Sequence, residues 1–595
     1  EAYRQSATLA EEGEQHGETA RALIHAAIAA ERDNQTQTAT TLLASALTHL
    51  EHVPDSYDKA SEWLLVGRAY HRLSTAQPTL ILPAADAYRK SADIAQALKD
   101  QRTLSYARGY LGRLYEDESR YPDALALTRR AVTAAQQVPE SLYQWEWQTG
   151  RLLQAMGQAQ PALHAYERAI ETVQSIRTAL LRRQRREHLS FRQTLGPLYF
   201  EYANLLLRKA EALSERKQAA VYPQHEIYLH LARAAVEQFK TQELRDYFGD
   251  ECVDAAHQRT VTIDYVSPDA VVLYPILLPD RTELLVSLPS ELKREGIPVS
   301  GADLEQRVRV FRNALEARDP RRYLRHAQRL YSWLIQPIEA ELKARAIQTI
   351  VFVPDGALRL LPIAALHDGQ QYLIETYAVS VTPSLTLTEP QSLSRHNLNV
   401  LVAGLTESVA GFPALPRVAE EVRNVQQIYG AKVLLDQEFS PERLQQTIQE
   451  GDFGIVHIAA HGHFAPDAAD SFLLTGQGKL TFDQLTQIVG QLRFRKQPLE
   501  LLTLSACETA HGDDRAALGL AGIAIQAGAR SALATLWRVQ DAAATRLMTS
   551  FYQHLQDPTM SRARALQQAQ LGLLKDAQHS NPFFWAPFLL INNWL

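Results

Sequence analysis

Two short apolar runs in this chain each end beside a residue that can do nucleophilic or acid–base chemistry. Ile455–Ala460 is followed directly by His461 and Gly462, and Leu501–Ala506 is followed by Cys507. Both runs are rich in β-formers, which is typical of strands buried in a parallel sheet. Functional residues of an open α/β sheet collect beyond the carboxyl ends of its strands. A histidine and a cysteine that meet there are the minimum equipment of a cysteine peptidase.

Three histidines at even spacing, His457, His461 and His463, raise the alternative of a metal site. No carboxylate or cysteine stands at ligand spacing beside them, and Gly462 is expected to end the strand. We therefore predict no metal and no cofactor. His457 is interpreted as a packed core residue and His463 as a residue at the rim.

Composition describes an ordinary globular protein that is long enough for two to four domains. Of its 595 residues, 46% are hydrophobic and 22% are charged. The net charge of −6 argues against a dedicated nucleic-acid binder. Two cysteines, Cys252 and Cys507, cannot build a disulfide framework, which favours a reducing compartment. No apolar run is long enough for a membrane span. The cytoplasm is favoured; because the chain begins at Glu1 rather than Met, export after signal-peptide removal is the alternative.

Residues 1–256 are rich in helix formers and repeat themselves. Gly112 and Gly150 occupy corresponding positions, as do Ala124 and Ala162, each pair 38 residues apart. Small residues at such offsets let antiparallel helices pack closely, which is typical of tetratricopeptide (TPR) repeats. One weaker copy is marked by Ala27, Ala39, Leu43 and Ala46. Another is marked by Gly67, Tyr70 and Tyr88, and it has an insertion before its second helix. An irregular helical bundle is the alternative, and a repeat array would present a concave surface to a protein partner.

Beyond residue 256 the pattern changes to short strands that alternate with helices. The first expected strands are Val261–Tyr265, Ala270–Leu278 and Glu283–Leu288, and Thr349–Val353 is a later buried one. Alternation of this kind predicts a largely parallel α/β sheet. We place the boundaries at residues 1–256 for the helical repeats, 257–395 for a first α/β part and 396–595 for a second one that carries the chemistry.

The second half resembles a known family, the CHAT domain, which is caspase-like and typically follows TPR repeats. The segments that carry the resemblance are Pro354–Arg359, Val456–Gly462, Leu504–Ala510, Ala527–Ala529, Leu536–Asp541 and Pro582–Ala586. The resemblance covers roughly residues 257–595. It implies a fold of TPR-like helical repeats followed by a caspase-like α/β domain with a mostly parallel sheet.

The resemblance also implies roles for individual residues. Cys507 would attack the scissile carbonyl as a thiolate, and His461 would supply the acid–base chemistry. The backbone N–H groups of Gly462 and Cys507 would hold the oxyanion. The alternative is a domain that keeps the fold without the activity.

Asp541 is a candidate for a substrate-selecting acid, because related separases use an acidic residue in this region to choose a basic residue before the cut. An acidic pocket attracts Lys or Arg electrostatically. The alternative role is to cap the helix that begins at Ala542. Glu508, Asp513 and Asp514 are alternative acids.

Two functions follow. The first is a TPR-regulated cysteine endopeptidase that cleaves a protein partner, with a protein substrate or activator bound through the repeats. The second is an inactive interaction scaffold whose partner capture does not depend on Cys507. Neither requires a membrane or a nucleic acid.

Overall fold

The chain divides into two compact units, Glu1–Leu205 and Leu206–Leu595. The computed structural model describes residues 2–177, 179–180, 190–214, 222–248, 267–289, 291–395, 398–490, 499–509 and 513–595. The side chains of residues 506–509, which include Cys507, lie outside this description, as does all of Cys252. No helix in the described ranges is long and apolar enough to cross a membrane.

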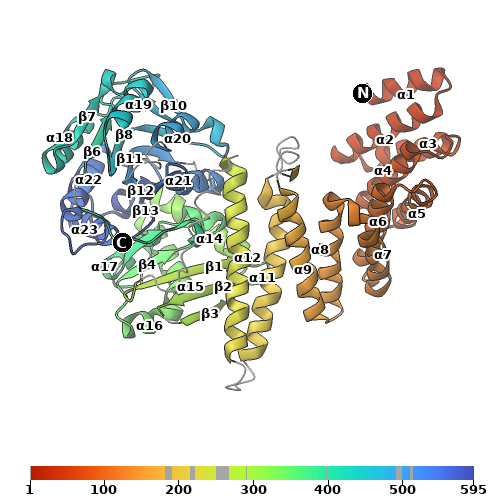
Figure 1. The fold of residues 1–595 in the computed structure, drawn as a ribbon, viewed down its shortest axis with the longest axis horizontal. Helices are drawn as coiled ribbons and strands as arrows, with labels where there is room; N and C mark the ends of the chain where they lie inside the picture. The colour runs from red at the N-terminus through yellow and green to blue at the C-terminus, as the bar shows by residue number, and fades with distance from the viewer. Residues whose placement is uncertain are drawn as a thin grey trace. The chain divides into compact units, whose positions relative to one another are not determined.

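The first unit is a series of helical hairpins (Figure 1). Its helices are α1 (Ala2–Glu12), α2 (His16–Arg32), α3 (Thr36–Glu51), α4 (Tyr57–Leu73), α5 (Ile81–Ala97), α6 (Gln101–Asp117), α7 (Tyr121–Ala134), α8 (Pro139–Ala155), α9 (Ala159–Ser175) and the first part of α11 (Phe191–Ser214). Each even-numbered helix from α2 to α8 packs against the helix that follows it, and α2, α4 and α6 each also pack against the next even-numbered helix. This arrangement confirms the predicted TPR-like helical repeats.

Glycines at corresponding positions explain how closely these helices approach. A Cβ on Gly67 would lie 2.6 Å from Tyr88 Cδ1, and a Cβ on Gly150 would lie 3.0 Å from Tyr166 Cδ2. Both tyrosines are fully buried. Gly67 and Tyr88 are 21 residues apart, whereas Gly150 and Tyr166 are 16 apart. The predicted insertion therefore lies between α4 and α5, where the short 3-10 helix Pro78–Leu80 is found.

Among the described residues of the second unit, thirteen strands form one sheet. The strands are β1 (Ala270–Leu277), β2 (Thr282–Leu288), β3 (Glu291–Ile297), β4 (Thr349–Phe352), β5 (Ala378–Val381), β6 (Val400–Gly404), β7 (Lys432–Leu435), β8 (Ile455–Phe464), β9 (Phe472–Thr475), β10 (Gly478–Thr481), β11 (Leu499–Thr509), β12 (Ala529–Thr535) and β13 (Phe588–Asn592). Their main order is β10-β9-β8-β11-β12-β13-β5-β4-β1-β2-β3; off this path, β6 pairs with β8 and β7 pairs with β6. Parallel pairs predominate, as predicted for a caspase-like α/β domain.

Helices cover both faces of the sheet (Figure 1). They are α12 (Tyr222–Phe248), α14 (Gly301–Glu316), α15 (Pro320–Leu334), α16 (Glu339–Ala344), α17 (Leu373–Thr376), α18 (Val418–Tyr429), α19 (Pro441–Glu450), α20 (Phe482–Gly490), α21 (Asp514–Gln526), α22 (Asp541–Leu555), α23 (Arg562–Leu574) and α24 (Pro582–Trp585). Helices α18 and α22 pack together over β6, β8 and β11, whereas α21 packs on β8, β11, β12 and β13 from the other face. The strands that carry the candidate dyad are thus enclosed between helices.

The structure differs from the sequence expectations in several places. Strands β3, β9 and β10 were not predicted; β9 and β10 have only four residues each, and most positions of β3 and β10 are at least partly exposed. Gly462 does not end its strand, since β8 continues to Phe464. The predicted strand Val261–Tyr265 lies outside the described residues. The expected boundary at residue 395 falls between β5 and β6, and the sheet continues across it where β13 pairs with β5.

Helix α12 packs on the α/β unit along its second half, from Arg233 onward. Lys240 Nζ donates to the carbonyl oxygens of Val353 and Pro354, and Arg359 forms an ion pair with Glu243. Lys240 is also 5.2 Å from the ring centre of Tyr274. The turn that begins at Pro354, one of the segments that resemble the CHAT domain, therefore lies against this helix. The division of the chain into compact units places α12 with the sheet, whereas the boundary at residue 256 remains a prediction.

Candidate active site

The candidate dyad lies on two adjacent parallel strands, β8 and β11. Ser505 lies opposite Ala459, and Cys507 lies opposite Gly462. Between these two pairs β8 has two residues where β11 has one, and the second of the two is His461. This is a β-bulge, an irregularity that redirects the side chains around it and is often found beside active sites. The register therefore brings the backbones of the three predicted residues side by side.

His461 is held by a backbone carbonyl. Its ring is 3% exposed, and Nε2 lies 2.8 Å from the carbonyl oxygen of Pro413. A carbonyl only accepts hydrogen bonds, so Nε2 carries a proton and donates it. In the neutral ring the lone pair then resides on Nδ1, which is the nitrogen able to act as a base. Phe412 packs at 5.3 Å between ring centres and limits how the imidazole can turn.

The segment that contributes Pro413 connects β6 to α18, and three hydrogen bonds fix it. Leu405 N donates to the carbonyl oxygen of Ala459 on β8, at 3.0 Å. Within the segment, Leu415 N donates to Thr406 O at 3.0 Å. At its end, Arg417 N donates to Oδ2 of Asp541 at 2.8 Å. The carbonyl that orients His461 is therefore anchored to the His461 strand at one end and to α22 at the other.

Asp541 is the first residue of α22 and is half-buried. The expected role as a helix cap is wrong, because the helix begins one residue earlier than predicted and Gln540 occupies the N-cap position. Burial raises the pKa of the Asp541 carboxyl, and the negative charge of Glu421 adds to this effect. The Arg417 N–H and the nearby His461 act in the opposite direction. The carboxylate lies within electrostatic range of the candidate base; its predicted role in selecting a substrate stays a proposal.

His457 belongs to a buried polar network rather than to the dyad. It is fully buried, with Nε2 at 2.9 Å from Glu421 Oε1 and Nδ1 at 3.1 Å from the hydroxyl of Tyr552. That hydroxyl is 2.9 Å from Thr503 Oγ1, on the neighbouring strand. The network joins α18 and α22 to the two strands that carry the dyad. His457 is thus a packed core residue, as its position had indicated.

The third histidine and two of the alternative acids, Asp513 and Asp514, have partners elsewhere. His463 is partly exposed and packs against Phe472 at 5.7 Å between ring centres. Asp513 Oδ1 accepts hydrogen bonds from two backbone N–H groups at the start of α21, and Asp514 lies 3.7 Å from Arg309. The side chain of Glu508 lies outside the described residues. No group of three or more metal-ligating side chains was found within the described ranges.

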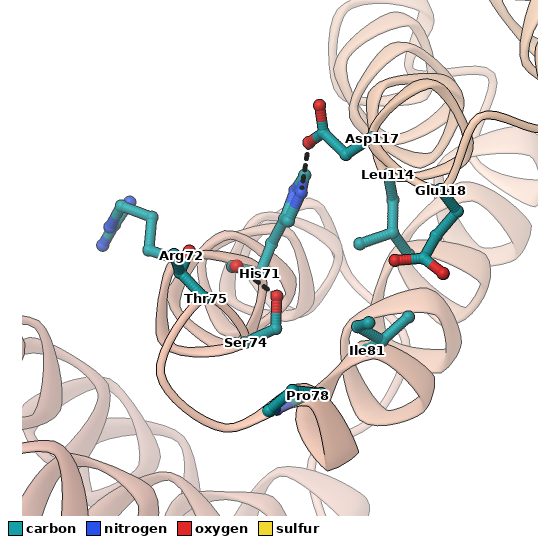
Figure 2. Close-up of a pocket in the computed structure, with 9 residues that line it drawn as sticks. All are labelled: His71, Arg72, Ser74, Thr75, Pro78, Ile81, Leu114, Asp117 and Glu118. Carbon is teal, nitrogen blue, oxygen red and sulfur yellow. Dashed lines mark hydrogen bonds and ion pairs between the residues drawn. The ribbon is translucent and has the colours of Figure 1, made fainter.

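A separate recess lies in the repeat unit, where the inserted loop meets α6 (Figure 2). Its volume is about 470 Å³. Ser74, Thr75 and Pro78 form the loop side, and Ile81 and Leu114 form an apolar patch. Across the recess, His71 Nε2 lies 2.9 Å from Asp117 Oδ2, which ties α4 to α6. The insertion therefore gives the repeats a recess with polar and apolar walls.

The comparisons with known proteins agree with this architecture. Residues 324–593 match the model of the CHAT domain, a family related to caspase-like peptidases. The part of the α/β unit from residue 324 to residue 593 is therefore a CHAT domain. A comparison with curated protein sequences gave no match.

Solved structures resemble the chain only over part of its length. BtubC (BKLC) from P. vanneervenii is 14% identical with a TM-score of 0.29, and the match covers 40% of this chain and 88% of that one. A kinesin light chain with nearly identical TPR-like repeats from Podosopora anserina is 17% identical with a TM-score of 0.26, covering 37% and 95%. Pseudomonas aeruginosa pilF is 16% identical with a TM-score of 0.24, covering 41% and 90%. The repeat assignment for this chain rests on its own helix pairing and glycine contacts.

Several residues around the site carried no signal in the sequence. Pro413 acts through its carbonyl oxygen, which any residue type provides. Glu421 and Tyr552 reach His457 from helices that are far away along the chain, so no local pattern links them. A backbone acceptor and long-range side-chain partners are visible only once the sheet register is known.

Proposed function

We propose that this protein is a cysteine endopeptidase in which Cys507 is the nucleophile and His461 the general base. The observation that carries the proposal is the bulge at His461, together with the carbonyl of Pro413. The bulge sets the histidine beside the Cys507–Gly462 pair, and the carbonyl leaves Nδ1 as its basic nitrogen. The CHAT family of this unit supports the same chemistry.

The proposed reaction has two halves. His461 Nδ1 takes the proton of the Cys507 thiol, and the sulfur attacks the scissile carbonyl carbon. The N–H groups of Gly462 and Cys507 hold the oxyanion that forms. His461 then gives its proton to the leaving amine, and a thioester remains on Cys507. Water hydrolyses the thioester with His461 again as the base, which releases the acid and the free thiol.

The repeats are proposed to bind a protein substrate or activator. Their hairpins provide the extended surface that such arrays use for proteins, and the recess between α4, α5 and α6 is one place on it. The two cysteines of the sequence fit a reducing compartment, so we place the activity in the cytoplasm. The second candidate function is a scaffold without catalysis, in which partner capture does not depend on Cys507.

An irreversible probe distinguishes the two candidates. A peptide acyloxymethyl ketone that ends in Arg should label Cys507 of the wild-type chain, and peptide mass spectrometry locates the label. We expect His461→Ala to slow labelling by roughly 100-fold or more, which is the usual contribution of a general base. His463→Ala is the matched control, two residues further along the same strand, and should stay within about twofold of wild type. Equal labelling of wild type and His461→Ala would leave the scaffold as the better account.

A further inference from the structure

The last turn of α12 contacts the segments that follow both dyad strands. Ala465 and Pro466 come directly after β8, and α21 begins shortly after β11. Tyr247 from α12 and Arg515 from α21 lie against these segments and against each other, with the Arg515 guanidinium 5.8 Å from the centre of the Tyr247 ring. Tyr247 and Arg515 thus hold the chain four to five residues after His461 and at the start of α21, seven to eight residues after Cys507.

The hydroxyl of Tyr247 is bonded to the residue that leaves the His461 strand. It donates to the carbonyl oxygen of Ala465 at 2.7 Å, and Ser471 Oγ accepts from the Ala465 N–H at 2.9 Å. Both backbone polar groups of Ala465 are therefore hydrogen-bonded to side chains. Burial raises the pKa of Tyr247 to about 12, so the hydroxyl keeps its proton and remains a donor through the range in which a peptidase works.

The ring of Tyr247 fills space that only a glycine leaves open. A Cβ on Gly519 in α21 would lie 2.2 Å from the Tyr247 hydroxyl and 2.5 Å from Cζ. The next residue, Phe248, meets Gly522 in the same way, at 2.3 Å from Cε2. These contacts belong to a small apolar cluster that also includes Leu244 and Leu518. The position of α21 relative to α12 is therefore fixed by close packing.

Arg515 joins the same three parts of the chain. Nε donates to the carbonyl oxygen of Pro466 at 2.9 Å, and Nη2 donates to Asp246 Oδ2 at 3.3 Å. Asp246 is almost fully buried, and the Arg515 side chain is about one-third exposed. One guanidinium thus connects the start of α21 to the end of α12 and to the segment after β8.

We propose that Tyr247 and Arg515 are positioning residues, which set the approach of His461 to Cys507 by holding the segments that follow their strands. This inference rests on the proposed peptidase function. Neither residue touches the reacting atoms. Displacements of about 1 Å at a reacting pair change rates by roughly 100-fold. Contacts one and two residues beyond β8, together with one six residues beyond β11, are therefore close enough to matter.

The test uses iodoacetamide, whose reaction needs no substrate recognition. The thiolate displaces iodide, so a carbon–sulfur bond forms and a carbon–iodine bond breaks. In the 595-residue chain, Cys252→Ser leaves Cys507 as the single cysteine. Alkylation rates are measured from pH 5 to pH 9 for this Cys252→Ser protein, the parent. The same rates are measured for three variants of the parent, which carry His461→Ala, Tyr247→Phe or Arg515→Ala in addition. Tyr228→Phe is the matched control, a partly exposed tyrosine on α12 whose ring lies 5.6 Å from Lys209.

We expect the midpoint of the parent's pH profile to lie below about 8.5, the usual pKa of a cysteine thiol, because His461 stabilises the thiolate. Tyr247→Phe keeps the ring against Gly519 and loses only the hydroxyl, so the fold should persist, as thermal unfolding would verify. Its pH profile should move toward that of His461→Ala, with alkylation at pH 6 slowed at least fivefold. Arg515→Ala should behave similarly, whereas Tyr228→Phe should match the parent.

The outcomes separate the two hypotheses. If the parent profile depends on His461 but Tyr247→Phe and Arg515→Ala coincide with the parent, the positioning role is wrong and the dyad stands. If the parent profile equals that of His461→Ala, the dyad itself is wrong, and the positioning proposal fails with it.

Discussion

At His461 two structural features act on a single imidazole. The bulge sets the position of the ring, and the hydrogen bond to the Pro413 carbonyl determines which ring nitrogen carries the proton. The sequence predicted the residue types, because a histidine and a cysteine at the ends of apolar runs are a strong signal beside the CHAT motifs. It could not predict the bulge, since nothing in Ile455–Phe464 shows where an extra residue enters the ladder.

Asp541 permits a prediction at the residue scale. Asp541→Asn keeps an oxygen that accepts from Arg417 N, so the anchor of the Pro413 segment should persist while the negative charge is lost. If Asp541 selects basic residues, the preference of the chain for an Arg-ending probe over a Leu-ending probe should fall at least tenfold. Asp541→Ala, which also loses the anchor, should slow both probes. An unchanged preference in Asp541→Asn would show that the carboxylate only holds the segment.

At the scale of elements, α12 shows what the Pro354 signature turn does in this chain. The turn presents carbonyl oxygens to Lys240 and a guanidinium to Glu243, so a motif recognised for its resemblance serves to dock a helix. Sequence periodicity placed α12 with the repeats, because its alanines and leucines resemble those of the hairpins before it. Buried residues such as Lys240 and Glu243 show that α12 also contacts the α/β unit, and a helix pattern gives no information on such contacts.

Lys240 permits a prediction of pH dependence. Burial lowers its pKa from 10.5 to about 8, against the favourable charge of Asp355. Between pH 8 and 10.5 the folded state has lost this proton while the unfolded state still holds it, so stability gains with rising pH in that window. The gain corresponds to about 3 kcal/mol. Below pH 8 both states hold the proton, and the cost of the buried charge is fully present.

The measurement compares thermal midpoints of wild type and Lys240→Met from pH 7 to 11. Subtracting the variant removes the titration of other groups. The midpoint of wild type minus that of the variant should rise by a few degrees across the window. A difference that stays constant with pH would contradict a depressed pKa at Lys240.

At the scale of the whole molecule, the chain has two units, and the contacts inside each unit follow a different pattern. Hairpins in the first unit contact their neighbours in sequence, and this regularity made the repeats readable from spacing alone. The second unit contains one sheet. Within it, β13 pairs with both β12 and β5, two strands that are more than 130 residues apart in the sequence. Sequence alternation predicted a parallel sheet but not this order, because strand order depends on contacts between distant segments.

Two alanine substitutions should act on separate units. A Cβ on Gly109 in α6 would lie 2.3 Å from Trp145 Cε2, so Gly109→Ala should lower a thermal transition of the repeat unit by several degrees. Gly572 in α23 has open space around it. Because alanine favours a helix over glycine by up to about 1 kcal/mol, Gly572→Ala should raise the temperature of a thermal transition of the α/β unit. Differential scanning calorimetry of both variants should show two transitions that shift independently. One transition that moves with both changes would contradict two separable units.

The central claim is that Cys507 and His461 form a working peptidase dyad. The most direct measurement is proteome-wide profiling of new protein N-termini in cells that express the wild-type chain, compared with Cys507→Ala and His461→Ala. The account predicts a limited set of new N-termini that appear with wild type and disappear with both variants. The same N-termini in all three samples, or none in the wild type once a partner of the repeats is present, would contradict it.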